Sequence, residues 1–194
     1  MDPLKKKIEL INESFKIIER EGWGNFSIKK LSETKKMSLN EVTHILKSRN
    51  NLINEFSYMI DKKVENDFDF KELDKTSIKD NLFELIMLRL EYLNPYRNAL
   101  KEIIKSFKTD PQLAKIVSTN VLNSLDFYLE ISNAYKDNFF DVFKKKSIFI
   151  IYGYVFTIWM QDDSDELSKT MSELDRLLTF SEKLAINFKN YTPF

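Results

Sequence analysis

The sequence predicts an all-α protein, and three observations support this fold class. Glycine and proline are scarce, with 3 and 4 residues in a chain of 194, so the chain holds few of the residues that turns between strands require. Apolar residues recur at spacings of three and four along most of the chain, as they do on the buried face of a helix. Capping and helix-breaking residues separate the apolar segments. We therefore expect about nine helices and no strand.

The first two helices are predicted by one apolar pattern and one capping residue. Apolar residues recur every three or four positions in Leu4–Ile18, which predicts a helix with one buried face. Gly22 is expected to end this helix, because glycine adopts the backbone conformation that closes a helix C-terminus. Ser27 is expected to cap a second helix, since a serine hydroxyl accepts a hydrogen bond from a free N–H of the first turn.

The third helix is predicted by a capping box. Ser38 and Glu41 have the S-x-x-E spacing in which each side chain bonds the other residue's backbone N–H. A longer fourth helix is expected over Leu52–Val64. Two short helices, a tight turn and the start of a further helix make Ser27–Phe56 the outline of a helix-turn-helix. Such an element places its second helix in the major groove of DNA.

The rest of the chain predicts five further helices. The polar and acidic segment 66–75 is expected to be a hinge, and Asp163 or Ser164 is expected to cap the last helix. The expected helices are Ser77–Tyr92, Tyr96–Phe107, Leu113–Tyr135, Asn138–Met160 and Ser164–Phe188. We predict two domains: a helix-turn-helix domain over residues 1–56, with a connecting helix to about residue 69, and a larger helical domain over residues 76–194.

The N-terminal pattern resembles the helix-turn-helix of TetR-type transcriptional regulators. The pattern I-x-x-x-F-x-x-I-x-x-x-G-W is followed by S-I-x-x-L and then by M-S-x-x-x-V-x-x-I-L-K-S-R-x-x-L-I. The match covers about Ile8–Phe56. The chain departs from the family at the turn, where Lys36 replaces the usual Gly. It also lacks the family's Lys-Gly-Thr opening of the recognition helix and its Tyr before the His, having instead Leu39, Asn40, Glu41 and Thr43.

The C-terminal half carries a second resemblance. It has W-x-x-D-D-S at Trp159–Ser164 and T-M-x-x-L-D-R at Thr170–Arg176. These motifs are similar to those of an alphaproteobacterial branch of the TetR family. They are also similar to a TetR-fold lipid-binding protein of coenzyme Q biosynthesis. The resemblance implies an N-terminal DNA-binding domain, a C-terminal ligand-binding domain and a homodimer formed through the last two helices.

Basic and polar side chains around the predicted turn are the candidate DNA contacts. Lysine and arginine supply phosphate contacts, whereas asparagine pairs with adenine and threonine contacts the thymine methyl group. We expect contacts from Ser27, Lys29, Lys36, Ser38, Asn40, Thr43, His44, Lys47 and Arg49, within a basic cluster that also holds Lys30 and Lys35. The alternative is a solvated basic face, because lysine is common throughout a chain whose 30 basic and 30 acidic residues cancel.

The larger domain supplies candidates for a ligand pocket and a dimer interface. An apolar pocket with a few polar groups would suit a lipid or another apolar small molecule. Its expected lining is Leu85, Leu88, Arg89, Tyr92, Leu122, Leu125, Tyr128, Tyr152 and Phe156. The expected interface with a second copy is Phe149, Trp159, Leu167, Met171, Leu174 and Leu178. The alternative for both groups is that these residues fill the core of a monomer.

Several classes of function find no support in the sequence. The chain has 1 His and no Cys, and it lacks a phosphate-binding glycine loop and a zinc-binding motif, so we expect no enzyme, metal site or cofactor. No signal peptide or transmembrane segment is expected, which makes a cytoplasmic location the default. Two hypotheses remain. The first is a TetR-type regulator that binds operator DNA as a ligand-responsive homodimer. The second is a TetR-fold lipid- or isoprenoid-binding accessory protein of quinone biosynthesis with a degenerate helix-turn-helix.

Overall fold

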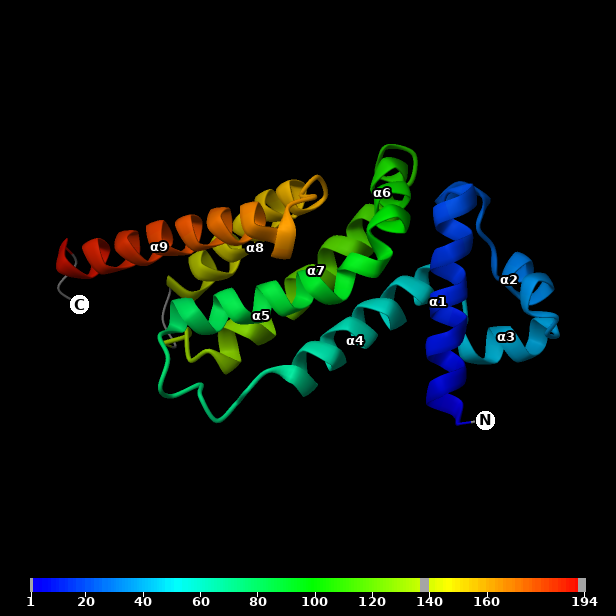
Figure 1. Ribbon diagram of the computed structural model, residues 1–194, viewed down its shortest axis with the longest axis horizontal. Coiled ribbons are helices and arrows are strands. Elements are labelled where there is room, and N and C mark those ends of the chain that lie inside the picture. Colours follow the sequence, from blue (N-terminus) through cyan, green and yellow to red (C-terminus); the bar gives the residue numbers. More distant parts are fainter. Residues whose placement is uncertain (1, 137–139, 192–194) are drawn as a thin grey trace. The chain divides into compact units, whose positions relative to one another are not determined.

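The computed structural model describes residues 2–136 and 140–191, and every regular element in these ranges is a helix (Figure 1). This confirms the all-α prediction. The chain packs as two compact units, which we call unit 1 (residues 1–63 and 93–121) and unit 2 (64–92 and 122–194). The division places residues 93–121 with the N-terminal helices. The domain boundaries expected from the sequence differ from it and stay a prediction.

Unit 1 contains the N-terminal helices and one later segment, residues 93–121, that packs with them. Its elements are α1 (Pro3–Glu21), η1 (Trp23–Asn25), α2 (Ile28–Lys35), α3 (Leu39–Ile45), the first part of α4 (Arg49–Asp67), η2 (Asn94–Tyr96), α6 (Arg97–Lys105), η3 (Ser106–Lys108) and the first part of α7 (Pro111–Ile131).

Local sequence explains the limits of α1. The Asp2 side chain accepts a hydrogen bond of 3.0 Å from the Leu4 N–H, and Pro3 occupies the first turn, where no N–H is needed. At the other end, the Gly22 N–H donates to the Ile18 carbonyl over 2.8 Å with φ at +81°. A residue with a side chain rarely adopts that φ. The end of the first helix at Gly22 was thus predicted correctly.

An aromatic cluster joins α1 to α4 and to η2. The rings of Phe15 and Phe56 stack with their centroids 3.9 Å apart, and the Tyr96 ring meets both edge-on. The Tyr96 hydroxyl donates to the Asn12 side chain over 2.7 Å, and Asn98 of α6 donates to Glu19 over 2.9 Å. These contacts hold α6 against α1 within unit 1.

Unit 2 is built from the end of α4, α5 (Ile78–Leu93) as far as residue 92, the second part of α7, α8 (Phe140–Trp159), η4 (Asp165–Leu167) and α9 (Ser168–Tyr191). Helices α8 and α9 lie side by side (Figure 1). The predicted start of α8 at Asn138 lies outside the described residues. The core is apolar and includes Leu85, Ile86, Leu90, Leu125, Val155, Trp159 and Leu174.

The predicted end of α7 at Tyr135 is wrong, because the helix stops at Ile131. Asn133 adopts a left-handed backbone with φ at +54°. The next residue, Ala134, donates its N–H to the Leu129 carbonyl over 3.0 Å. This arrangement closes helix C-termini, and asparagine tolerates it better than most residues.

The predicted start of the last helix at Ser164 is also wrong. A short 3-10 turn intervenes, in which Glu166 and Leu167 have positive φ, and α9 begins at Ser168. Asp162 organises this connection, because its carboxylate accepts the N–H and the hydroxyl of Thr170 over 2.8 and 2.6 Å. Ser164 also donates to Asp162, through its N–H and its hydroxyl. Asp162 and Ser164 therefore both stabilise the start of α9, because the Ser164 hydroxyl accepts the Ser168 hydroxyl over 2.9 Å.

Candidate nucleic-acid interface

The turn between α2 and α3 is closed by backbone hydrogen bonds. The Met37 N–H donates to the Ser32 carbonyl over 3.0 Å, and the Lys36 N–H donates to the Glu33 carbonyl over 3.1 Å. Lys36 is left-handed, with φ at 52° and ψ at 38°. The turn therefore has the conformation for which glycine is favoured, and here a lysine adopts it. This conformation directs the chain from α2 into α3.

Both predicted serine caps are confirmed. The Ser27 hydroxyl accepts the Lys30 N–H over 3.1 Å at the start of α2. At the start of α3, the Ser38 hydroxyl accepts the Glu41 N–H over 3.2 Å, and Glu41 accepts the Ser38 N–H over 3.0 Å. Hydrogen bonds to the Glu41 carboxylate from the Ser38 hydroxyl and then from the Ser38 N–H lower the pKa of Glu41. The capping box fixes where α3 begins, and so it fixes which side chains face outward.

Helix α3 has a buried side and an exposed side. Val42 and the following Leu46 are fully buried, and with Leu31 of α2 they form the small core beneath the helix. Asn40 and His44 are exposed, and Thr43 is half-buried. The three side chains expected to read bases therefore lie away from the core of unit 1, where a partner can reach them.

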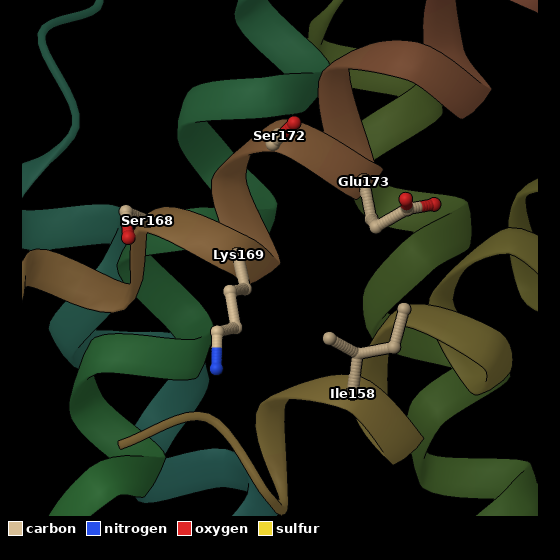
Figure 2. A pocket seen from close by; sticks show the side chains of 5 residues that line it. All are labelled: Ile158, Ser168, Lys169, Ser172 and Glu173. Carbon is tan, nitrogen blue, oxygen red and sulfur yellow. The ribbon is translucent and has the colours of Figure 1, made fainter. Parts of the chain in front are cut away.

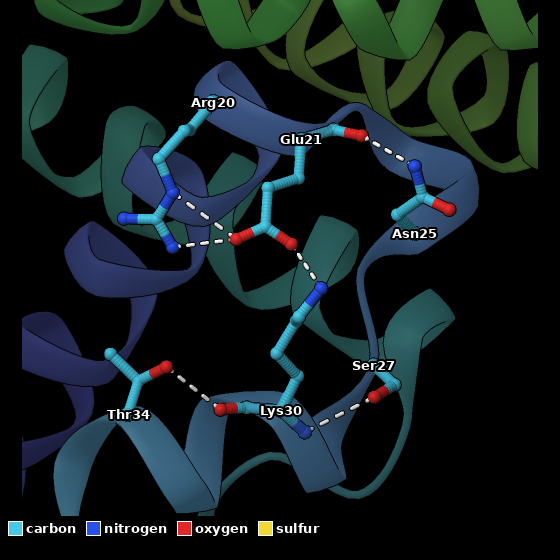
Figure 3. Close-up of polar contacts among 6 residues, drawn as sticks. All are labelled: Arg20, Glu21, Asn25, Ser27, Lys30 and Thr34. Carbon is cyan, nitrogen blue, oxygen red and sulfur yellow. Dashed lines mark hydrogen bonds and ion pairs between the residues drawn. The ribbon is translucent and has the colours of Figure 1, made fainter.

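Ion pairs divide the basic cluster into bound and available lysines. Lys30 pairs with Glu21, which also accepts two hydrogen bonds from Arg20, and these contacts lower the pKa of Glu21 (Figure 3). Lys35 pairs with Glu9 of α1, which raises the pKa of Lys35. Both lysines therefore hold α2 against α1.

The remaining lysines of the turn region are exposed. Lys29 lies 4.0 Å from Glu33, one helical turn away. Lys36 and Lys47 make no ion pair among residues 2–136 and 140–191. A lysine without a carboxylate partner loses less when it binds a phosphate, so Lys36 and Lys47 are the strongest phosphate-binding candidates of the sequence-predicted set.

Arg49 is held by contacts within unit 1. Its guanidinium lies 4.6 Å from the centroid of the Trp23 ring, and its Nη2 atom is 3.7 Å from the Asp110 carboxylate. The Trp23 indole N–H donates to the same carboxylate over 3.3 Å. Two hydrogen bonds lower the pKa of Asp110. The larger effect comes from the Leu113 N–H, and the smaller from the Trp23 indole N–H. These contacts give Arg49 a structural role that the sequence did not indicate, because Asp110 lies far along the chain.

The residues expected to line a ligand pocket all belong to unit 2. Leu85, Leu125 and the polar side chains of Arg89, Tyr128 and Tyr152 are buried. The expected lining residues Leu88, Tyr92, Leu122 and Phe156 are half-buried. The pocket itself stays a prediction. What the structure adds is a set of buried polar side chains within an apolar core.

The residues expected at a dimer interface divide between core and surface. Trp159 and Leu174 are both 0% exposed, and Leu178 is also buried, so these three pack inside unit 2. Phe149 and Leu167 are half-buried, and only Met171 is exposed. The interface stays a prediction, but three of its six expected members are already buried in the core of unit 2.

Helices α8 and α9 expose large apolar side chains beyond the six residues expected at the interface. The exposed fraction reaches 70% for Ile150 and 59% for Phe180, and Phe143, Tyr154 and Leu184 are exposed as well. We call these five residues the α8–α9 face. The continuous apolar sequence of α8 hid this distinction, because a helix that is apolar all round gives no periodic signal for its outer side.

An open hollow lies between α8 and α9. Figure 2 shows Ile158 of α8 across from Lys169 and Glu173 of α9, with Ser168 and Ser172 on the same rim. A second hollow runs along α9 past Arg176 and Phe180. The side chains that line the first or the second hollow are not those expected to line the ligand pocket. They lie instead along the outer surface of the two helices.

Comparison with known proteins identifies the fold. The chain is similar to a TetR transcriptional regulator from Nitrosomonas europaea, with a TM-score of 0.75, 16% identity, and coverage of 90% of this chain and 96% of the other. It is also similar to a putative TetR-family regulator from Mesorhizobium loti (TM-score 0.59, 12% identity, 92% and 96% covered). A putative transcriptional regulator from Pseudomonas aeruginosa gives a TM-score of 0.58 at 12% identity, with 92% and 93% covered.

These similarities show the fold of TetR-type transcriptional regulators over almost the whole chain. No family model matches the sequence, and no curated protein matches it either. The resemblance to a lipid-binding protein of coenzyme Q biosynthesis stays a prediction. Within residues 2–136 and 140–191, no helix combines the length and apolar character that crossing a membrane requires.

Proposed function

We propose that this protein is a TetR-type transcriptional regulator that binds duplex DNA as a homodimer through α2 and α3. The observation that carries the proposal is the capped helix α3. Its capping box sets its start, Val42 anchors its inner side, and Asn40 and His44 face outward. A short helix exposed in this way on a helix-turn-helix is the element that enters a major groove.

The charges around α3 support the same role. The first 56 residues hold more basic than acidic side chains, although the whole chain is neutral. Lys36 follows α2 and Lys47 follows α3, so the two available lysines flank the outward side chains in sequence. Local phosphate contacts of this kind can bind DNA without a net positive charge on the whole protein.

The test is retention of duplex DNA in a gel at low ionic strength, using DNA upstream of the coding sequence and a pool of random duplexes. Lys36→Glu with Lys47→Glu should abolish retention, and the helical circular dichroism signal should be unchanged. The matched control is Lys101→Glu with Lys115→Glu, which makes the same charge change at exposed positions on α6 and α7. The control should retain DNA. Equal retention by both double variants, or none by the wild type, would contradict the proposal.

The proposed dimer forms through the α8–α9 face. Exposed large apolar side chains on two adjacent helices favour burial against a partner. Gly153 lies on the exposed side of α8, and beyond its own stretch of helix a Cβ atom there would meet no atom of the described residues within 4 Å. A glycine inside a helix costs about 1 kcal/mol relative to alanine. Because packing within this chain does not require Gly153, we assign it to the close approach of a second copy.

The proposed ligand is an apolar molecule with a polar or anionic group, bound in unit 2. Apolar pockets with a few fixed polar groups select such molecules, and Arg89, Tyr128 and Tyr152 are among the buried polar residues of unit 2. Native mass spectrometry of the purified protein should report a dimer and any co-purified ligand together. A monomer mass would contradict the proposed dimer. A bound isoprenoid in a protein that retains no DNA would support the quinone-biosynthesis hypothesis instead.

A further inference from the structure

The outward side of α3 carries two stripes of different chemistry. Leu39 and Thr43 are four residues apart and so lie on one face of the helix, which we call the methyl stripe. Asn40 and His44 have the same spacing and form a neighbouring polar stripe. Leu39 is 47% exposed although it is a large apolar residue. Its exposed side chain and Thr43 are therefore available together to a partner of α3.

The hydroxyl of Thr43 is turned back onto its own helix. It lies 3.0 Å from the Leu39 carbonyl and 3.1 Å from the Asn40 carbonyl, and it donates its hydrogen to them. A base could accept a hydrogen bond from the Thr43 hydroxyl only if this hydroxyl first broke its contact with the two carbonyls. The methyl group is therefore the part of the side chain that can meet a base without cost. Leu39 and Thr43 both present methyl groups, and neither offers a free donor from its side chain.

The other ways in which α3 could read a base are reduced by its sequence and contacts. Glu41 is the natural acceptor for the cytosine amino group, but it already accepts hydrogen bonds from the Ser38 N–H and hydroxyl over 3.0 and 2.9 Å. The helix sequence LNEVTHI contains neither Lys nor Arg, which are the usual partners of guanine. Apart from His44, whose ring N–H could donate to guanine, the side chains of α3 are thus poorly suited to G·C pairs.

We propose that α3 reads A·T base pairs, with Leu39 and Thr43 contacting thymine methyl groups and Asn40 pairing with adenine. In the major groove only thymine presents a methyl group, and adenine presents the donor and acceptor that an asparagine amide matches. This assignment rests on the proposed DNA binding. It adds Leu39 as a specificity-determining residue, at a position where the chain departs from the usual lysine of the family.

If α3 contacts thymine methyl groups, the protein should bind a duplex with thymine more tightly than the same duplex with uracil. Deoxyuridine has the same hydrogen-bonding edge as thymidine and lacks only the 5-methyl group. Removing one buried methyl-sized contact costs about 0.8 kcal/mol, which is about fourfold in affinity for each contacted thymine. A protein that read only hydrogen bonds would bind both duplexes equally.

The experiment selects binding sites from a random duplex pool and then replaces each thymine of the selected site with deoxyuridine. We expect an A·T-rich core and a loss of about fourfold at each contacted thymine. Leu39→Ala should bring the ratio of thymine to uracil affinities close to one at its contacted position. Leu39 is exposed, so this variant should fold, which circular dichroism checks.

The pair Thr43→Val and Thr43→Ser isolates the methyl group from the hydroxyl. Thr43→Val keeps the methyl and should preserve the preference for thymine, whereas Thr43→Ser keeps only the hydroxyl and should reduce it. A G·C core, equal affinity for thymine and uracil, or the reverse order of the two Thr43 variants would overturn the inference while the DNA binding stood. A failure to select any duplex would remove the proposed function, and this inference with it.

Discussion

Lys36 combines backbone strain with the placement of a positive charge. It is left-handed, with φ at 52°, a conformation that costs a residue with a side chain about 1–2 kcal/mol. Its exposed ammonium group makes no ion pair among the described residues. The position therefore favours glycine for stability and lysine for contact with phosphate.

Replacing Lys36 should separate these two effects. Lys36→Gly should raise the free energy of unfolding by about 1 kcal/mol, because glycine adopts positive φ without strain. Lys36→Ala removes the charge but keeps the strain, so it should give no such gain. Denaturant unfolding measures both, and both variants should bind DNA more weakly. A Lys36→Gly protein no more stable than Lys36→Ala would show that the turn is unstrained.

Asp162 is a buried residue whose hydrogen bonds determine its protonation state. Burial disfavours its carboxylate, but hydrogen bonds from Ser164 and Thr170 outweigh this, so the pKa of Asp162 lies well below its usual range. A lowered folded-state pKa contributes stability above the unfolded value near 3.8. That contribution is lost as the pH falls through the folded-state pKa.

The corresponding prediction concerns the pH dependence of Asp162→Asn. At pH 7 the variant should be less stable than the wild type by about 2–4 kcal/mol, because hydrogen bonds to a buried charge are lost. The difference should narrow as the pH falls below about 4, because the carboxylate of the unfolded wild type then binds a proton while that of the folded protein stays charged. Denaturant unfolding at several pH values measures it. A difference that stayed constant down to pH 2 would contradict the role of the charge.

At the scale of elements, helix limits were predictable wherever a local signal sets them. Gly22, Ser27 and the capping box of Ser38 and Glu41 each act within a few residues, and each does what its pattern predicted. The start of α9 was not predictable in this way. It depends on Asp162 reaching Thr170 across a turn with positive φ at Glu166 and Leu167. The sequence shows these residues but not the conformation that brings them together.

Helix α8 provides a prediction about its outer side. Gly153→Trp should leave the protein helical but shift the proposed dimer to monomer, because the added ring would lie where we propose that a second copy approaches. Glu130→Trp places the same ring at an exposed position on α7 and should leave the proposed dimer intact. Sedimentation velocity measures the masses. A Gly153→Trp protein that remained dimeric would place the interface elsewhere.

At the scale of the whole molecule, the fold was predictable but the availability of side chains was not. Apolar periodicity and scarce glycine indicated the helices. The same sequence did not show that Lys30 and Lys35 are paired with α1, that Arg49 packs on Trp23, or that Trp159 is buried. These facts depend on contacts between residues distant in the chain. Fewer lysines are therefore available around the turn than the sequence suggests, and the proposed DNA binding would depend on these few.

The salt dependence of duplex binding tests the central claim most directly. Affinity should fall steeply with salt, with a slope of about −0.9 for each phosphate contacted. Removing Lys36 or Lys47 should reduce that slope by about one for each protomer bound, whereas Lys101→Glu with Lys115→Glu should leave it unchanged. The absence of duplex binding at low salt, or a slope that stays the same when Lys36 and Lys47 are removed, would contradict the proposed DNA binding.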